Sequence, residues 1–228
     1  MIGIIGAMDV EIESIKKLIS NPECKSLAHI NFFSGKISNV DCVVAVCGPG
    51  KVNAAICTQL MISNYNPKLI INTGIAGSAM PQIKIGDIVL ADFVVQHDMD
   101  TSALGDARGL ISGINLIQIS CAIDINETIK AIAKQLGETL HIGVIATGDQ
   151  FISNSQKLAD IKNTFNAAAC EMEAGSIGHV CLVNGVKLAA LRVISDNANE
   201  ESHIDYNKFK FIVAERTTRL IANLIPEI

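Results

Sequence analysis

The chain contains 228 residues, enough for one large domain, and 49% of them are hydrophobic, which supplies a substantial core. Its net charge of −5 argues against binding to nucleic acid or to an acidic membrane surface. No apolar segment approaches the roughly 18 residues that a membrane span needs, and the apolar N-terminus lacks the basic residues of a secretory signal. We therefore expect a cytoplasmic protein without a membrane or nucleic-acid partner.

The cysteines and histidines give no indication of a metal centre. The seven cysteines form no C-x-x-C pair and mostly occupy apolar segments, so we expect buried free thiols in a reducing compartment. The five histidines are scattered, without an H-E-x-x-H motif or a pair at helical spacing. The sequence thus predicts neither a metal site nor a metal cofactor.

The chain begins with a predicted strand, Ile2–Ala7, and a predicted amphipathic helix, Asp9–Ile19. The glycines of this strand do not complete a G-x-G-x-x-G loop, so an NAD-dependent enzyme is not favoured. Acidic residues, among them Glu11, follow the turn where a phosphate cradle would carry a basic one. They either form a solvated first helical turn, where acids suit the helix dipole, or contribute to a site.

A β-rich stretch follows, in which strands over 31–37 and 42–47 flank a predicted hairpin turn at Ser38-Asn39. After a helix over 52–64, the continuous apolar run Leu69–Ile71 is typical of a buried parallel strand. This strand is expected to end in the glycine-containing segment Asn72–Gly77. That segment is either a tight turn or a place where backbone amides approach a ligand closely.

The next predicted elements are a strand over 86–91, a helix over 126–136 and a strand over 141–146. Between the first two lies a long glycine-punctuated loop over 92–113, and such loops are usually lids, binding loops or interface arms. Phe151 follows the third element. Its ring either stacks on a flat ligand or fills the core.

Two carboxylates flank Met172 in Cys170–Gly175, at the predicted junction between a strand and a buried helix over 176–182. Carboxylates that share a pocket are costly to bury, so we expect them to handle protons or to bind sugar hydroxyls. The buried strand Val186–Ile194 then ends near Asp196. An acid at the exit of a central strand suits ligand chemistry in an α/β sheet, although it could instead cap a turn or a helix.

A last helix, Tyr206–Ile225, is predicted with Asp205 as its N-cap. Strands and helices alternate along the chain without an internal repeat or a linker. The sequence therefore predicts a single α/β domain over residues 1–228.

Five motifs occur in order and at matching spacing over nearly the whole chain, and together they resemble the 5′-methylthioadenosine/S-adenosylhomocysteine nucleosidases of the nucleoside phosphorylase superfamily. They are Gly6–Met8 with Glu11, Asn72–Gly74 with Ala76-Gly77, Gly148-Asp149 with Phe151-Ile152, Glu171–Glu173, and Arg192 with Ile194–Asp196. The resemblance implies a three-layer α/β/α domain around a central mixed, partly barrel-like sheet. It also implies a cofactor-free homodimer whose partner chain helps to close the 5′ end of the substrate pocket.

The implied activity is hydrolysis of the N-glycosidic bond of 5′-methylthioadenosine and S-adenosylhomocysteine, and also of 5′-deoxyadenosine, in methionine salvage and the recycling of S-adenosylmethionine by-products. By the resemblance, Asp196 donates a proton to N7 of adenine and Glu11 activates the attacking water. Glu173 binds the ribose hydroxyls, Phe151 stacks on adenine, and the backbone of Ile152 binds its edge.

The resemblance places further residues around the substrate. Met172 packs on the sugar, Gly77 contributes backbone, Ser195 orients Asp196, and Tyr206 lies near the 5′ substituent. Arg192 stands behind these groups. Two more substrate-site residues are carried by the same motifs, namely Met8 and Ala76.

The candidate residues also suit N-glycosidic bond cleavage on chemical grounds alone. A purine leaves most easily when its N7 is protonated, and the ribosyl cation needs nearby negative charge and an attacking water. Two carboxyl groups of this kind serve inverting glycoside hydrolysis. A phosphorylase would instead need arginines or other donors for a dianion, and the acidic turn at Glu11 repels phosphate. A non-catalytic nucleoside-binding protein is expected to lack Glu11 or Asp196, and both are present. The preference among nucleosides that differ in their 5′ substituent is left open, because no role at the 5′ end of the pocket is assigned to Leu104 or to the neighbouring loop.

Overall fold

The computed structural model describes residues 1–199 and 201–228, and the side chains of all of these except 203–208 and 210–214. Its strands are β1 (Ile2–Gly6), β2 (Ser20–Leu27), β3 (Ile30–Ile37), β4 (Val40–Val46), β5 (Leu69–Ser78), β6 (Ile88–Gln96), β7 (Ile119–Ser120), β8 (Leu140–Thr147), β9 (Ala167–Glu171) and β10 (Lys187–Asp196). Its helices are α1 (Asp9–Lys16), α2 (Lys51–Tyr65), α3 (Ile123–Gln135), α4 (Ser155–Phe165), α5 (Ala174–Asn184) and α6 (Ser202–Leu224), with short 3-10 turns η1 (Ser102–Leu104) and η2 (Ile225–Glu227).

The strands form one mixed sheet that closes on itself over part of its width. The order is β10-β6-β8-β9-β5-β1-β4-β3-β2, and β10 also pairs with β5, so that β10, β6, β8, β9 and β5 make a closed ring. Strands β1, β5 and β10 run parallel, whereas β6 is antiparallel to β10 and β9 is antiparallel to β5. The mixed, partly barrel-like sheet expected for the family is confirmed.

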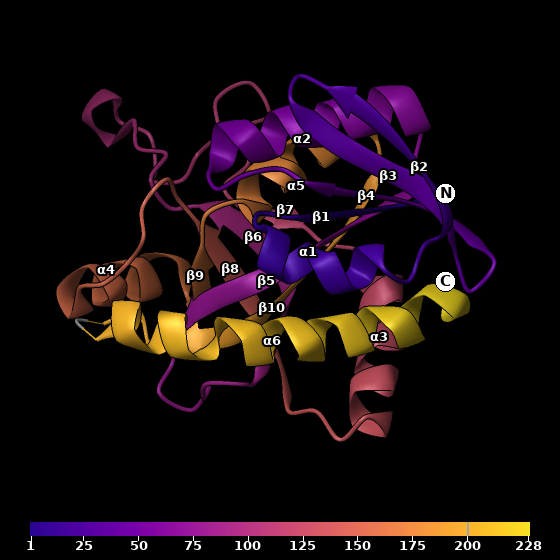
Figure 1. Cartoon of the computed structure of the whole chain (residues 1–228). Coiled ribbons are helices and arrows are strands. Elements are labelled where there is room, and N and C mark those ends of the chain that lie inside the picture. Colours follow the sequence, from indigo (N-terminus) through magenta and orange to yellow (C-terminus); the bar gives the residue numbers. More distant parts are fainter. Residues whose placement is uncertain (200) are drawn as a thin grey trace.

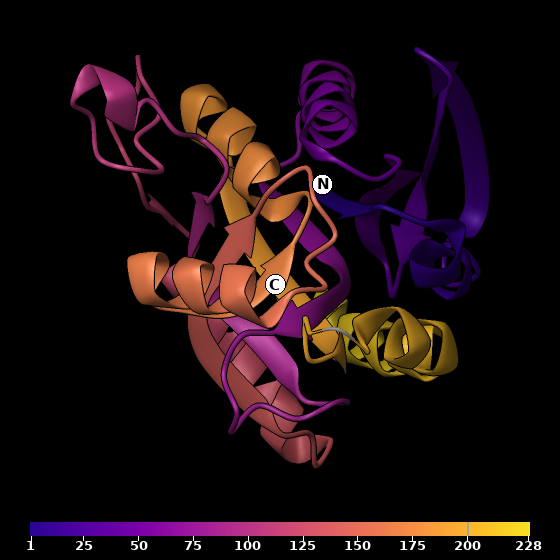
Figure 2. The ribbon, with the colours of Figure 1, turned by 90° about the vertical axis from the view of Figure 1, so that its left-hand side faces the viewer.

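Helices cover the sheet on two sides (Figure 1). Helix α6 packs against α1, α3 and β10, and α2 packs against α5. In Figure 2, α2 and α5 lie side by side, across the strands from α6. Within the described part of the chain, every helix falls short of the length and apolar character that a membrane span requires.

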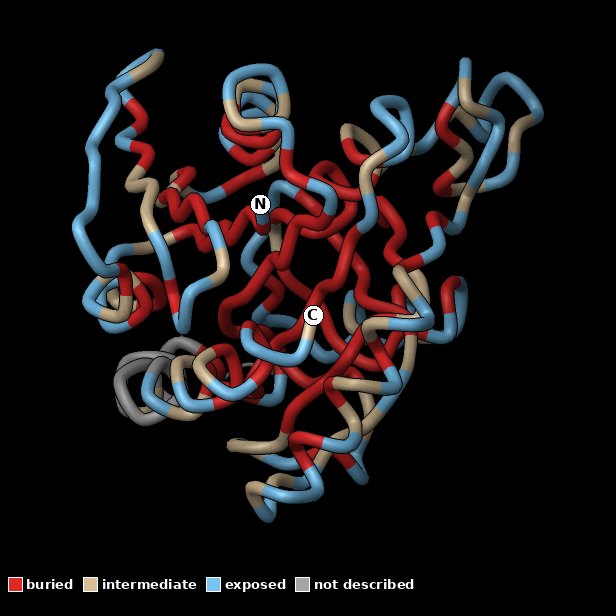
Figure 3. Tube along the Cα trace, turned by 90° about the vertical axis from the view of Figure 1, so that its right-hand side faces the viewer, coloured by how far each residue is buried: buried red, intermediate tan, exposed pale blue. Residues whose placement is uncertain are grey.

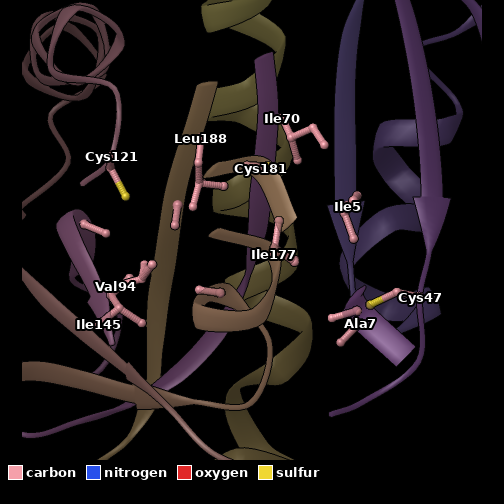
Figure 4. Close-up of a cluster of buried hydrophobic side chains, with 14 of the residues drawn as sticks. Ile5, Ala7, Cys47, Ile70, Val94, Cys121, Ile145, Ile177, Cys181 and Leu188 are labelled. Atoms are coloured by element: carbon pink, nitrogen blue, oxygen red, sulfur yellow. The ribbon is translucent and has the colours of Figure 1, made fainter. Parts of the chain in front are cut away.

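The buried residues lie in the interior of the molecule (Figure 3), and their side chains form separate apolar clusters on the two faces of the strands. Along β1, Ile5 belongs to one apolar cluster, whereas Ile2 and Ile4 belong to the cluster on the other face. This division follows the two-residue period of a strand, which sends successive side chains to opposite faces. Figure 4 shows part of the first cluster, in which Ala7 and Cys47 lie close together near the end of β1.

Two tight hairpins build the open part of the sheet. Ser38 and Asn39 have φ values of 49° and 68° and join β3 to β4, as the turn of a type I′ hairpin requires, so this predicted hairpin is confirmed. Ala28 and His29 make the equivalent turn between β2 and β3. Strand β2 was not predicted, because its residues are polar and almost all exposed, and they lack an alternating pattern.

The prediction that the strand starting at Leu69 ends in the segment Asn72–Gly77 was wrong. Strand β5 continues to Ser78 through the whole segment Asn72–Gly77 and pairs with β10 as far as Gly77. The glycines do not form a turn but allow acidic side chains to approach the strand closely. A Cβ atom at Gly74 would lie 2.6 Å from Glu11 Oε1. A Cβ atom at Gly77 would lie 2.9 Å from a carboxyl oxygen of Asp196.

Other elements also differ from the predictions. Strand β6 runs to Gln96, so the first part of the expected loop is sheet. Helix α4 was missed, although the Asn154 side chain caps it by accepting a hydrogen bond from the Lys157 amide at 2.9 Å. Helix α6 begins at Ser202, so Asp205 lies inside the helix and is not its N-cap. All seven cysteines are free thiols, and Cys24 is the exposed one.

Candidate active site

The carboxyl ends of the parallel strands β1, β5 and β10 meet at one edge of the sheet, where α/β sheets generally bind their ligands. A cavity of about 200 Å³ opens there. It is lined by Ala7, Met8, Glu11, Pro49, Ile75, Ala76, Gly77, Phe151, Cys170, Glu171, Met172, Glu173, Ser195 and Asp196. An adjoining recess of about 40 Å³ shares six of these residues and adds Gln150, Ile152 and Ala198. The carboxylates at 11, 173 and 196 therefore share one cavity.

Glu11 sits in the first turn of α1 and folds back over the start of its own helix. Its Oε2 accepts hydrogen bonds from the amides of Ala7 at 2.8 Å and Met8 at 3.0 Å, and its Oε1 accepts one from Ile75 at 3.1 Å. The side chain is buried, and this burial raises the pKa of the Glu11 carboxyl, opposed by Arg192 and by the three amides. Glu11 is therefore a buried acid held by neutral donors.

Glu173 follows the last residue of β9 by two positions and immediately precedes α5. Its Oε1 accepts a hydrogen bond from the Gly50 amide at 2.9 Å, and its Oε2 lies 3.9 Å from the Arg192 guanidinium. Burial, together with the nearby Glu171 carboxylate, raises the pKa of Glu173 to about 8, opposed by Arg192 and the Gly50 amide. Its proton is thus exchangeable near neutral pH.

Asp196 is the last residue of β10 and is buried. The Ser195 hydroxyl donates to its Oδ2 at 2.8 Å, and the Ala198 amide donates to its Oδ1 at 2.8 Å. These two donors fix the plane of the carboxyl group at the wall shared by the cavity and its recess. The expected support of Asp196 by Ser195 has this geometric basis.

Arg192 lies behind the cavity and not on its wall. Its guanidinium is buried and donates to the Glu171 carboxylate and to the side chain and carbonyl of Asn72. Glu171 also accepts hydrogen bonds from the Thr147 hydroxyl and from the amides that open α5. Arg192 is thus a supporting residue behind the cavity, as the resemblance implies, and it is not a direct substrate contact, because its guanidinium is committed to Glu171 and Asn72.

The remaining wall is largely apolar. Phe151 is 48% exposed on the rim, and the neighbouring Ile152 borders the recess. Cys170 also contributes to the wall, and burial raises the pKa of its thiol to about 12, with Glu171 and Asp196 adding to the effect. Cys170 is therefore a neutral surface and not a thiolate nucleophile.

The structure brings together the predicted residues Met8, Ala76, Gly77, Met172 and Ser195 with the three carboxylates on the cavity wall. The Tyr206 side chain lies outside the described residues. Sequence reasoning missed the roles of Gly50 and Cys170 and the pairing of Glu171. The G-P-G-K segment carried a signal for Gly50, because Gly50 has a φ of 96°, which other residues rarely adopt. In the described part of the chain, no group of three or more His, Cys, Asp or Glu side chains is arranged so that it could hold a metal ion.

Comparison with known proteins agrees with this geometry. The family model of the phosphorylase superfamily matches residues 1–226. The 5′-methylthioadenosine/S-adenosylhomocysteine nucleosidase of Shewanella halifaxensis is 36% identical over 229 residues, covering 100% of this chain and 99% of the relative.

Solved structures are similarly close. A Helicobacter pylori nucleosidase mutant with 5′-methylthioadenosine in the active site has a TM-score of 0.96 at 33% identity, covering 100% of this chain and 98% of that one. The futalosine hydrolase of the same organism also has a TM-score of 0.96, at 34% identity over 100% of this chain and 97% of the other. The chain therefore belongs to the phosphorylase superfamily and, within it, to the family of 5′-methylthioadenosine/S-adenosylhomocysteine nucleosidases.

Proposed function

We propose that the chain, as a single nucleosidase domain over residues 1–228, hydrolyses the N-glycosidic bond of 5′-methylthioadenosine and S-adenosylhomocysteine. The products are adenine and the 5′-substituted ribose. The observation that carries the proposal is the cavity in which Glu11 and Glu173 face a space also lined by Asp196. Its relatives are named for the same two substrates. The reaction serves methionine salvage and the recycling of S-adenosylmethionine by-products.

In this proposal the water is activated by a particular oxygen of Glu11. Its Oε2 already accepts two amide hydrogen bonds, whereas Oε1 accepts one, from Ile75. A carboxylate oxygen has two lone pairs, so Oε1 has capacity for one further proton donor. The water therefore donates to Oε1 and attacks C1′ of the ribose, and its proton passes to Glu11.

Asp196 completes the reaction on the side of the base. As the C1′–N9 bond breaks, its electron pair moves into the purine and N7 takes the proton of Asp196, so that adenine leaves as a neutral molecule. Glu173 accepts hydrogen bonds from the ribose hydroxyls and places negative charge near the oxocarbenium-like transition state. Phe151 stacks on adenine and the Ile152 backbone binds its edge, while Met8, Met172, Ala76 and Gly77 pack around the nucleoside. No cofactor is required.

Hydrolysis is favoured over phosphorolysis by the charge of the cavity. Among the described residues that line it, the ionisable side chains other than a cysteine are acidic, and no Lys or Arg is present. A phosphate dianion beside Glu11 would meet like charge without a basic partner, whereas a neutral water would not. The test is adenine release from 5′-methylthioadenosine with and without phosphate. We expect equal rates and one reducing sugar per adenine, and a requirement for phosphate would contradict the proposal.

The 5′ substituent decides between related substrates. The solved futalosine hydrolase is as similar in fold as the nucleosidase, so aminodeoxyfutalosine is included beside 5′-deoxyadenosine in the comparison. We expect 5′-methylthioadenosine and S-adenosylhomocysteine to have the highest kcat/KM. A nucleoside-binding protein without catalysis would instead give a stoichiometric calorimetric signal and no adenine.

We also infer a cytoplasmic homodimer. Exposed apolar side chains stand on the adjacent helices α2 and α5, among them Val52 at 68% and Val183 at 59%, and Leu104 is 84% exposed. Apolar surface of this kind suits a protein–protein interface. Seven free thiols suit a reducing compartment. Light scattering at micromolar concentration is expected to give twice the chain mass, and a monomer would contradict the inference.

A further inference from the structure

Three charged side chains that do not line the cavity form a closed ring beside it. The Lys51 ammonium contacts Asp98 Oδ1 at 2.7 Å, the Asp149 amide donates to Asp98 Oδ2 at 2.9 Å, and the Lys51 amide donates to Asp149 Oδ1 at 2.7 Å. The three residues come from the start of α2, the segment after β6 and the segment after β8. Lys51 and Asp98 keep only 19% and 18% of their side chains exposed, so the pair is sheltered from solvent.

The ring is joined to the cavity at two points. Gly50 immediately precedes Lys51, and its amide is the donor to Glu173 Oε1 at 2.9 Å. Asp149 stands two residues before Phe151, which forms the rim of the cavity. The ring therefore connects Gly50, the donor to the ribose-binding carboxylate of Glu173, with the loop that carries Phe151 on the adenine side of the cavity.

The backbone at this junction has little freedom. Gly50 has a φ of 96°, and a Cβ atom there would lie 3.0 Å from Asp149 Oδ1. The Asp149 carboxylate therefore packs directly against the Gly50 backbone while it accepts from the next amide. Withdrawing this acceptor would release the turn that aims the Gly50 N–H at Glu173.

We propose that Lys51, Asp98 and Asp149 are positioning residues that hold the Gly50 N–H on Glu173 and set the distance between the sugar and base subsites. This role rests on the proposed nucleosidase function. The three side chains do not touch the cavity, so they act through Gly50 and through the Phe151 loop. Their contribution appears in substrate binding and in the ionisation of Glu173, and not in the proton transfer of Asp196.

The Asp149 position offers a test in which geometry and charge predict opposite results. Asp149→Ala removes the acceptor of the Lys51 amide, whereas Asp149→Asn loses the same charge but keeps an oxygen acceptor at Oδ1. Loss of the Gly50 hydrogen bond disfavours ionised Glu173, so the acid limb of kcat/KM is expected to move up by roughly half a pH unit to one unit in the Ala variant. The removal of a negative charge alone would move the limb down in both variants.

The other charged groups near Glu173 are unchanged by these substitutions. They are Glu171 and Glu11, which favour its protonation, and Arg192, which opposes it. We expect KM for 5′-methylthioadenosine to rise about 5-fold to 10-fold at pH 7 in Asp149→Ala with kcat changed less than 3-fold, and Asp149→Asn to restore most of the loss. A downward shift in both variants, or no shift in Asp149→Ala, would overturn the proposal.

Two further measurements separate this proposal from the proposed function. Amide hydrogen exchange of Gly50, followed by NMR without substrate, is expected to accelerate in Asp149→Ala and not in Asp149→Asn, and unaltered protection would overturn the ring's role even in an inactive protein. Wild-type adenine release tests the function by itself. Asp124→Asn is the control, because Asp124 pairs with Lys187 at 2.6 Å at the far end of β10, roughly 30 Å along the strand from Asp196. It is expected to change none of these values.

Discussion

Two groups of buried carboxylates lie side by side in this molecule and are stabilised in different ways. Glu171 is paired with the Arg192 guanidinium and accepts further hydrogen bonds from Thr147 and from the amides at the start of α5. Glu11 is held by backbone amides, and Asp196 by a hydroxyl and an amide. Both groups are buried, and the Arg192 guanidinium hydrogen-bonds to Glu171, whereas it lies 3.9 Å from Glu173 without a hydrogen bond between them.

The difference separates structural charge from reactive charge. A cation in contact fixes a carboxylate in its ionised form, whereas neutral donors orient it but leave it able to take up a proton. Accordingly, burial raises the pKa values of Glu11 and Glu173. Burial alone would lower the pKa of Arg192, but the adjacent Glu171 carboxylate raises it and keeps the guanidinium charged. The same sheet edge thus holds one permanent ion pair and a set of carboxyls suited to proton transfer.

The largest effect is expected from Asp196→Asn, which tests the reactive group. The Asn side chain keeps an oxygen that can accept from Ala198, but it has no proton to give to N7. Because a general acid contributes about 10²–10⁴-fold, turnover should fall by roughly 10³-fold or more while an adenosine analogue still binds. Adenine release and calorimetry measure the two quantities. The exposed Asp41→Asn serves as the control, and retained turnover in Asp196→Asn would remove Asp196 from the mechanism.

Arg192→Met tests the structural group and should act on folding. It leaves Glu171 buried without its cation, and breaking a buried pair costs about 3–5 kcal/mol. Urea unfolding should show this loss, and the double change with Glu171→Gln should recover part of it. Arg108→Met, which breaks a partly exposed pair with Asp160, is expected to cost less than about 1 kcal/mol. Equal losses at both arginines would mean that the Arg192 pair has no special role.

Gly74→Ala tests whether Glu11 must occupy its present position. The added Cβ would lie 2.6 Å from Glu11 Oε1, so the carboxylate must move away from the Ile75 amide and from the water that it activates. A misplacement of this size lowers kcat by about 10²-fold. In Gly35→Ala the new atom would lie 2.5 Å from an Ile19 methyl group in the outer hairpin, so stability should fall while kcat per folded molecule is kept. Similar kcat losses in both variants would indicate a general folding defect.

The sequence predicted most of the elements that carry the site, for reasons visible in single residues. The apolar runs of β1 and β10 are buried along their length, so hydropathy alone located them. Asp196 is the last residue of β10, Glu173 follows β9 by two positions, and Glu11 lies in the first helical turn after β1. These positions, together with the order of the five motifs, were enough to predict that they meet in one cavity.

The parts that could not be predicted depend on contacts between distant segments. Nothing in the β10 sequence shows that it pairs with both β5 and β6 and so closes the ring of strands. The glycines at 74 and 77 resemble turn residues, because the side chains that need their space come from α1 and β10. Glu171 and Glu173 stand equally close to Met172 in the chain. Only the three-dimensional arrangement shows that both line the cavity and that the Arg192 guanidinium is in direct contact with Glu171.

Glu173→Gln is expected to give the smallest effect and to sharpen the contrast with Glu171. Because burial raises the folded pKa of Glu173 to about 8, the unfolded chain loses its proton from about pH 4.5 upward while the folded chain keeps it. Folded stability therefore falls as pH rises through this window, and a neutral Gln, which still accepts from Gly50, avoids the loss. The variant should gain on the order of 1–2 kcal/mol at pH 7 and nothing at pH 4.

Calorimetric unfolding of the wild type and the Glu173→Gln variant between pH 4 and 8.5 measures this gain. The sign of the stability change distinguishes Glu173 from Glu171. Glu171→Gln removes the partner of a buried guanidinium and should destabilise the fold. Glu173→Gln should stabilise it while weakening substrate binding, as expected where a buried charge is kept for activity and not for folding. A Glu173→Gln variant that is less stable at pH 8 than the wild type would place Glu173 with Glu171, as a structural charge neutralised by Arg192.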